Sequence, residues 1–254
     1  MSRKILKQHH IGLKKGDIAE AVLLPGDPGR CDVIAGHFSA PLFKGSFREF
    51  KTFTGSYEGI PVSCTSTGIG CPSSSIAMEE LINIGGRVFV RVGTCGAMQK
   101  HVKPGDIVIA EGAIRGDGTS LEYIRPEYPA VADFSLTMAL KNACRDEGVR
   151  YYAGIIRSHD AFYAESPFVK GDFMSKIKPW VEAGTLAVEN ESSLMFVLGR
   201  LRKVKVATIL LVMGNLLTRE EAWRADLREK WIGGLIDLTL KGVKLYYEKW
   251  KDTY

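Results

Sequence analysis

The feature that most constrains the fold of this chain is an alternation of short buried-strand patterns with helical patterns. Six short runs have the length of a buried strand and are flanked by turn residues, and the last of them, Val206–Met213, is strongly apolar and β-branched. Strands that alternate with helices are typical of a largely parallel or mixed sheet covered on both faces. The sequence therefore predicts an α/β fold, with a central mixed, twisted sheet flanked by helices on both faces. The runs are Ala21–Leu24, Val62–Ser66, Val88–Val92, Ile107–Ala110, Ala153–Ile156 and Val206–Met213.

The helical patterns lie between and after these runs. Pro72 and the three serines that follow it predict a helix start, because proline is favoured in the first turn of a helix. Ala77, Leu81 and Ile84 then recur at helical spacing. No internal repeat or break in composition divides the 254 residues, so a single domain over residues 1–254 is predicted. Further helices are predicted over residues 135–147, 190–201 and 220–250.

Composition and charge exclude some classes of function for this chain. Hydrophobic residues make up 45% of the sequence and charged residues 25%, which is ordinary for a globular protein. No apolar run approaches the ~20 residues of a membrane span, and no apolar stretch of a signal peptide follows the basic N-terminus. The net charge of +5 is spread along the chain, which disfavours nucleic acid as a partner and suits a small anionic substrate.

Cysteine usage indicates a reducing compartment. The five cysteines show neither a CxxC pair nor a metal-ligand spacing with histidine, so no metal site is predicted. An odd, scattered set in a chain of this size predicts buried, reduced thiols and a cytoplasmic location. Scarce glutamine beside plentiful lysine, arginine and glutamate is a bias of hyperthermophile proteins and suggests a heat-loving source.

Three predicted strand ends carry glycine-rich segments. Residues 24–30 read LPGDPGR, residues 67–73 read TGIGCPS and enter a helix, and residues 91–96 read RVGTCG. Glycine lets the backbone approach a ligand, a helix N-terminus offers free amides, and arginine is a permanent cation. None has the spacing of a Walker or dinucleotide-binding motif. Each segment alone is consistent with an ordinary turn, and together they predict a small-anion site at one edge of the sheet.

Arg91 is unusual because it lies inside the apolar run Val88–Val92. A buried arginine is costly unless a carboxylate or a bound anion compensates its charge. The sequence alone therefore leaves two interpretations open, a structural ion pair with a core carboxylate and an anion-binding role.

Eight blocks of sequence resemble the trimeric and hexameric nucleoside phosphorylases, and within them the uridine branch. They follow the order and spacing of that family from about His10 to Asn215, and several are long and distinctive. The resemblance implies phosphate-dependent cleavage of a nucleoside into free base and ribose 1-phosphate. The blocks are GDPGR (26–30), FREF (47–50), STGIGCPSSSIAMEEL (66–81), RVGTCGAMQ (91–99), GDIVIAEGAIRGDGTS (105–120), YPAVADF (128–134), SHDAFY (158–163) and VENES (188–192).

The resemblance also implies roles for particular residues. Phosphate is the co-substrate, no cofactor is needed, and a structural monovalent cation is compatible with the family. The phosphate site is matched by Gly26, Arg30, Arg91 and Thr94, with Arg48 from a neighbouring subunit. The ribose site is matched by Asn190, Glu191 and, across the interface, His10. The base pocket is matched by Cys95, Gly96, Phe162, Ser166 and Met213.

Because two of these residues cross an interface, the resemblance implies a homo-oligomer, expected to be a hexamer. The implied partners are thus a nucleoside, phosphate and further copies of this chain, with no nucleic acid and no membrane.

Three departures from the family pattern bear on the base and the sugar. The acid that protonates the base in purine-specific relatives is absent from Leu211–Asn215, and a general acid is worth about 10²–10⁴ in rate. Asn215 offers a hydrogen bond there but no proton. Ser166 and Phe168 replace the glutamine and arginine that bind the uracil edge. Asn190 replaces a methionine that packs near the sugar.

The sequence favours a uridine phosphorylase but leaves alternatives. A purine nucleoside or methylthioadenosine phosphorylase would need another proton donor. A nucleosidase that uses water would leave Arg30, Arg48 and Arg91 without a purpose. A catalytically impaired nucleoside-binding protein is the alternative from another class, motivated by the departures above.

Overall fold

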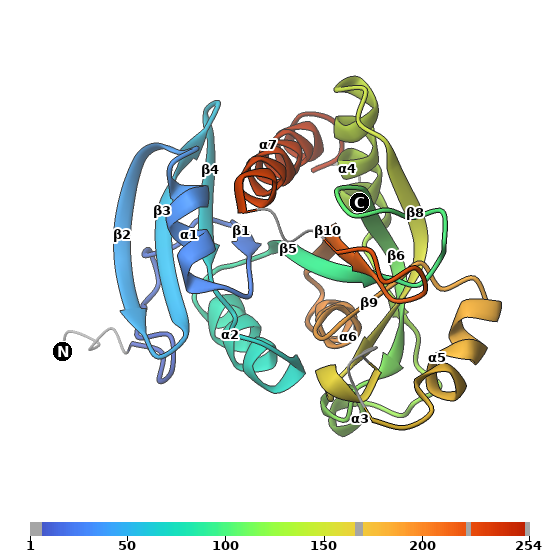
Figure 1. The fold of residues 1–254 in the computed structure, drawn as a ribbon. Helices are drawn as coiled ribbons and strands as arrows, with labels where there is room; N and C mark the ends of the chain where they lie inside the picture. The colour runs from blue at the N-terminus through green and yellow to red at the C-terminus, as the bar shows by residue number, and fades with distance from the viewer. Residues whose placement is uncertain (1–6, 166–169, 222–224, 252–254) are drawn as a thin grey trace.

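The computed structural model describes residues 7–165, 170–221 and 225–251 (Figure 1). Its described strands form one mixed sheet in the order β10-β6-β8-β9-β5-β1-β4-β3-β2, with β7 paired to β6. The strands are β1 (Ala21–Leu24), β2 (Ser39–Phe47), β3 (Phe50–Tyr57), β4 (Ile60–Thr65), β5 (Val88–Ala97), β6 (Ile107–Gly116), β7 (Ala130–Val131), β8 (Tyr151–His159), β9 (Ala187–Glu189) and β10 (Lys205–Asn215).

Part of this sheet closes on itself. Strand β10 pairs in parallel with β5 and antiparallel with β6, while β6, β8, β9 and β5 follow one another as neighbours. Five strands therefore form a ring, and β1, β4, β3 and β2 extend the sheet away from it. Strands β1, β4, β5 and β10 run parallel, so their carboxyl ends meet at one edge.

Helices cover both faces of the sheet (Figure 1), and a separate hydrophobic core lies on each face. Side chains of α2 and α6 fill the core on one face, and those of α1, α4 and α7 fill the core on the other. The helices are α1 (Pro28–Ala35), α2 (Cys71–Asn83), α3 (Thr119–Tyr123), α4 (Phe134–Asp146), α5 (Phe173–Glu182), α6 (Ser192–Arg202) and α7 (Ala225–Lys249), with a 3-10 turn, η1 (Phe162–Glu165).

The predicted fold class is confirmed, and each predicted strand and helix has a counterpart in the structure. Two glycine-rich segments differ from the expectation of strand-end loops. Residues 91–96 lie inside β5, which continues to Ala97. In LPGDPGR, α1 begins at Pro28 with Asp27 as its N-cap, so Arg30 lies in the first helical turn. The local reason is that proline suits the first helical turn and aspartate caps it.

The five cysteines are free and buried, as predicted. None of the helices in the described part of the chain combines the length and apolarity that crossing a bilayer requires.

Candidate active site

The candidate site is built where β1, β4 and β5 end, beside the turn between β9 and α6. The loops after β1 and β4 lie side by side, because the amide of Thr67 donates to the carbonyl of Pro25 at 2.9 Å and that of Gly68 to Gly26 at 3.0 Å. The second loop leads into α2, whose first amides have no partner within the helix. Ligands of α/β sheets gather at strand ends of this kind.

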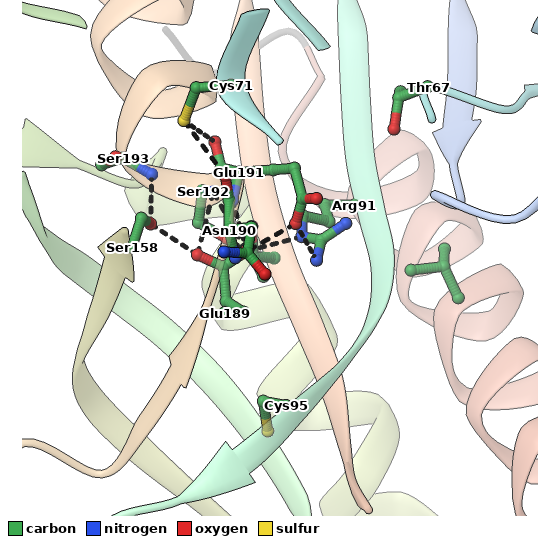
Figure 2. A network of polar contacts seen from close by, with 12 residues as sticks. Thr67, Cys71, Arg91, Cys95, Ser158, Glu189, Asn190, Glu191, Ser192 and Ser193 are labelled. Atoms are coloured by element: carbon green, nitrogen blue, oxygen red, sulfur yellow. Dashed lines mark hydrogen bonds and ion pairs between the residues drawn. The ribbon is translucent and has the colours of Figure 1, made fainter. Parts of the chain in front are cut away.

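Arg91 on β5 is the centre of a buried charge cluster (Figure 2). Its Nε donates to Oε2 of Glu189 at 2.8 Å, and its Nη2 lies 2.5 Å from Oε2 of Glu191. A Cβ on Gly93 would lie 2.8 Å from Cζ of Arg91, so glycine makes room for the guanidinium. Burial alone would lower the pKa of Arg91, but the two carboxylates outweigh it and raise this pKa. An ion pair with core carboxylates, one of the two sequence interpretations, is therefore confirmed.

The two glutamates of the cluster have different surroundings. Glu189 accepts hydrogen bonds from the amides of Glu191 and Ser192, at 3.0 and 3.1 Å, and from the Ser158 hydroxyl. Glu191 instead reaches the loop before α2, where its Oε1 accepts from the amide of Gly70 at 2.6 Å. Burial raises the pKa of Glu191, against the lowering effect of Arg91. Glu189 thus shapes the turn into α6, whereas Glu191 borders the strand-end loops.

Arg30 brings a second cation to this place. It is 7% exposed, and its Nη1 donates to the carbonyl of Val92 at 2.9 Å. Its Nε is buried without a hydrogen-bond partner among the described residues. Burial and the charge of Arg91 lower the pKa of Arg30. Two guanidiniums held close enough to repel each other form a site suited to an anion.

The residues expected around the base lie further along β5 and at the end of β10. Thr94 and Gly96 are partly exposed on β5, while the Cys95 thiol is buried and donates to the carbonyl of Leu211 at 3.7 Å. Met213 lies where the register between β5 and β10 shifts, and such bulges re-aim side chains. Thr94, Gly96 and Met213 therefore share one end of a strand pair, and the Cys95 side chain belongs to the core.

The side chain of Asn215 is committed to the fold. Its Nδ2 donates to the carbonyls of Gln99 and Val102 at 2.9 and 2.8 Å. Its Oδ1 accepts from the amides of Leu217 and Thr218 at 2.9 and 3.0 Å. Both donor hydrogens are used, so the expectation that Asn215 offers a hydrogen bond to a base is wrong.

Replacing Asn215 by alanine is expected to lower the free energy of unfolding by about 3 kcal/mol, because buried backbone groups lose their partners. Asn215→Asp keeps the acceptors and loses the donors, so it should lie between alanine and wild type. Urea unfolding measures both variants. An alanine variant as stable as wild type would contradict this structural role.

Asn190 and Phe162 both lie near the end of β8. The Nδ2 of Asn190 donates to the carbonyl of His159 and so ties the β9–α6 turn to the end of β8. Phe162 lies on η1 and is 59% exposed, with its ring edge-on to that of Tyr163. Ser166, expected in the base pocket, lies outside the described residues.

His10 and Arg48 do not join the Arg91 cluster. Nδ1 of His10 lies 2.8 Å from Oε1 of Glu80, which is nine residues after Cys71 and therefore roughly 13 Å along α2 from its start. Arg48 is exposed in the turn between β2 and β3, with a φ of 56° that residues other than glycine rarely adopt. Glu49 lies within the electrostatic reach of both. Among the described residues, no hydrogen bond or ion pair links His10 or Arg48 to Arg91, Glu189 or Glu191.

A second ion pair, largely buried and missed in the sequence, lies near this site. Nη2 of Arg157 on β8 is 2.8 Å from Oε1 of Glu165 at the end of η1, and the guanidinium lies 4.8 Å over the Trp180 ring. One strand, β9, separates Arg157 from Gly96. The available signal was an arginine directly after the apolar run 153–156. This pair fastens η1 and its exposed phenylalanine to the sheet.

Leu216 was also missed. It approaches Gly96 so closely that a Cβ there would collide with its Cδ1, and it packs with Val188 and Met98 in a small third core. The expected base pocket is therefore bordered by an aliphatic side chain directly after β10. Nothing in the sequence distinguished this leucine from its neighbour Leu217.

Known proteins match nearly the whole chain. The family model described as the Phosphorylase superfamily matches residues 20–232. A uridine phosphorylase of Treponema pallidum is 46% identical over 242 residues, which cover 94% of this chain and 93% of that protein. A guanosine phosphorylase of Halorubrum lacusprofundi is 41% identical, with 83% and 85% covered. The crystal structure of a uridine phosphorylase from Vibrio fischeri superposes with a TM-score of 0.87 at 31% identity, covering 97% of this chain and 100% of that one.

Proposed function

The chain belongs to the phosphorylase superfamily, and from that premise we propose that it cleaves uridine with inorganic phosphate, releasing uracil and ribose 1-phosphate. One observation carries the proposal: Arg30 donates to the carbonyl of Val92, the residue after Arg91 on β5, so two arginines meet at one strand end beside the carboxylate of Glu191. An attacking phosphate dianion needs fixed cations of this kind. An enzyme that used water would leave Arg30 without a function.

The residues divide the work of the reaction. As the bond between C1′ and the base nitrogen stretches, the sugar becomes positively charged, and the bound phosphate stabilises it before attacking C1′. Arg30, Arg91, the Thr94 hydroxyl and the backbone of Gly26 hold the phosphate. Glu191 accepts hydrogen bonds from the 2′- and 3′-hydroxyls. The reaction needs no covalent intermediate and no cofactor, and phosphate is consumed as a co-substrate.

The end of β10 supports uracil as the leaving base. Met213, Gly214 and Asn215 offer no carboxylic acid, and the Asn215 amide is bound to the backbone. A purine that leaves without a general acid forgoes about 10²–10⁴ in rate. A departing uracil anion spreads its charge over two carbonyl oxygens and needs that proton less.

A guanosine phosphorylase is the second candidate. Besides the Halorubrum relative, one structural observation favours it: Glu221 forms an isolated bridge with Gly214 at the end of β10. Its Cγ lies 3.5 Å from where a Cβ on Gly214 would be, so a carboxylate is near the strand end after all. If guanosine is the better substrate, Glu221→Gln should lower its turnover and leave that of uridine unchanged.

The proposal is tested by incubating the protein with uridine, thymidine, guanosine, inosine, adenosine and methylthioadenosine, each with and without phosphate. Release of uracil only in the presence of phosphate is the expected result. Release without phosphate would indicate a nucleosidase. Binding of uridine with no turnover of any nucleoside would indicate an impaired binding protein.

Arg30→Ala is expected to raise the KM for phosphate about 10- to 100-fold while the protein stays folded. Among the described residues, the side chain makes one hydrogen bond, to the carbonyl of Val92, so its loss leaves few of their groups unsatisfied. Initial rates at varied phosphate give the KM, and thermal unfolding monitors the fold. An unchanged KM would exclude Arg30 from the phosphate site.

We propose that neighbouring copies complete the site. Neither His10 nor Arg48 is bonded to the Arg91 cluster among the described residues, and the exposed apolar side chain of Phe47 directly precedes Arg48 at the surface. Exposed patches of this kind mark interfaces. A hexamer requires more than one kind of contact, and Leu121, Val131 and Phe134 are further exposed apolar side chains.

Mixing two impaired variants is expected to restore part of the activity. Arg48→Ala lacks the residue donated to a neighbour, whereas Glu191→Gln is defective in its own pocket. After co-refolding at equal amounts, about a quarter of the sites combine an intact pocket with a donated Arg48. Phosphate-dependent uracil release measures the recovery. No recovery in mixed oligomers that are shown to form would mean that Arg48 acts within its own subunit.

The thiols support a cytoplasmic location. The five cysteines are free and buried, a state typical of a reducing compartment. We therefore place the reaction in the cytoplasm.

A further inference from the structure

The carboxylate of Glu80 on α2 bonds the loop that carries His10. Its oxygens accept the backbone amide of His10, 3.0 Å from each, and the amide of Ile11 at 2.8 Å. Its Oε1 also lies 2.8 Å from Nδ1 of the His10 ring. The carboxylate is mostly buried, whereas a third of the His10 side chain is exposed. Both the backbone and the ring of His10 are thus oriented by Glu80.

This contact determines which ring nitrogen of His10 carries the proton. Burial raises the pKa of Glu80, but the hydrogen bonds from Ile11 and His10 outweigh it and place this pKa below its usual value. An ionised carboxylate only accepts hydrogen bonds, so Nδ1 must be the donor. In the neutral ring Nε2 then carries a lone pair. No described residue bonds Nε2, so it is an acceptor available to another molecule.

We propose that Glu80 is a positioning residue that fixes His10 as a hydrogen-bond acceptor for the 5′-hydroxyl of the ribose bound to the neighbouring subunit. The inference rests on the proposed function, in which His10 is donated across the interface. It adds a substrate class, because the enzyme selects nucleosides whose 5′ position can donate a hydrogen bond. A hydroxyl satisfies this acceptor, whereas a 5′-thioether or 5′-ether has no proton to give.

The preference for a 5′ hydrogen-bond donor follows because Glu80 holds the His10 ring in one tautomer. A histidine free to change tautomer would pair with a 5′ donor or a 5′ acceptor equally well. Glu80 removes that freedom, since protonating Nε2 instead would leave a lone pair on Nδ1 facing the carboxylate. A site built to bind a hydroxyl discriminates against analogues that lack it.

The test compares uridine with 5′-deoxyuridine and 5′-O-methyluridine in the full oligomer. Wild type should prefer uridine over both analogues by about tenfold or more in kcat/KM. His10→Ala should remove this preference, and Glu80→Ala should reduce it to within about threefold of His10→Ala, because the two residues act as one unit. Glu80→Ala that slows all three substrates by the same factor would overturn the proposal and leave Glu80 a purely structural role.

Two further variants keep the test decisive. Glu79→Ala is the matched control: its carboxylate precedes Glu80 on the same helix but pairs with Arg202, so the 5′ preference should persist. If Glu80→Ala does not assemble into the oligomer, Glu80→Gln takes its place in the test. Its amide can donate to Nδ1 and leave the proton on Nε2, so 5′-O-methyluridine should gain relative to uridine. An unchanged ratio in Glu80→Gln would contradict the tautomer argument.

The design also separates this inference from the proposed function. If uridine is not cleaved but guanosine is, the base assignment fails and the same comparison runs with guanosine and 5′-deoxyguanosine. If nothing is cleaved, calorimetric binding of uridine and 5′-deoxyuridine to wild type and Glu80→Ala gives the same ratio. A preference that survives in Glu80→Ala overturns the inference in either case.

Discussion

Replacing Arg91 by alanine is expected to lower kcat/KM for phosphorolysis by about 10³-fold or more, because a fixed cation that stabilises the attacking phosphate is lost. The same change should lower the free energy of unfolding by about 3–5 kcal/mol, since it leaves two carboxylates buried without their cation. Arg91 bonds Glu189 and Glu191 at 2.8 and 2.5 Å, deep in the protein. Initial rates of uracil release and urea unfolding measure the two effects.

A triple variant separates the chemical loss from the loss of stability. Arg91→Met with Glu189→Gln and Glu191→Gln removes three charges and keeps side chains of similar size. Neutral replacements of buried ion pairs are often as stable as the pair itself, so most of the stability should return while activity stays absent. Arg91→Ala with a wild-type rate would exclude Arg91 from the phosphate site.

Glu191→Gln is expected to lower kcat/KM about 100-fold for uridine and about tenfold for 2′-deoxyuridine. Hydrogen bonds to a charged group contribute about 1.5–3 kcal/mol each, and the deoxy sugar has one hydroxyl fewer to lose. Glutamine keeps the size of the side chain and an oxygen for the amide of Gly70, which Glu191 binds at 2.6 Å. The loss therefore reports on the carboxylate charge more than on the loop.

The matched control is Glu189→Gln, the same change two residues earlier. Glu189 bonds the backbone of the β9–α6 turn and Ser158, so its amide variant should affect both sugars alike and lower the stability. Rates with both nucleosides and urea unfolding are measured for each variant. An equal loss for uridine and 2′-deoxyuridine in Glu191→Gln would remove Glu191 from the 2′-hydroxyl.

The elements that the sequence predicted are those with one dominant local signal. The run Ala21–Leu24 is β1 residue for residue, because a short apolar stretch closed by Pro-Gly has few alternatives. Strands β2 and β3 gave no such signal, since β2 is largely exposed and mixes polar with apolar residues. Strand β3 pairs with β2 on one side and β4 on the other, and hydropathy alone does not identify such pairings.

For the same reason, the sequence predicted some residues of the site correctly and others not. Arg91 was conspicuous because a charge inside an apolar strand demands compensation. The sequence of that strand did not identify the partners of Arg91. Glu189 and Glu191 are about 100 residues away and meet Arg91 only because the strands of the sheet pair. Asn215 shows the opposite error: a polar side chain at a strand end looked available to a ligand, and tertiary hydrogen bonds occupy all of it.

By itself, the sequence determined the fold class, the strands and helices with strong periodicity, and the presence of arginine and glycine segments suited to an anion. These are local properties, because hydrophobic spacing and side-chain chemistry act over a few residues. Only the tertiary structure decided that Arg30 bonds β5 next to Arg91, that Glu80 orients His10, and that Asn215 is unavailable. Those facts depend on contacts between distant segments, and which of the possible partners meet is determined by the packing of the whole sheet.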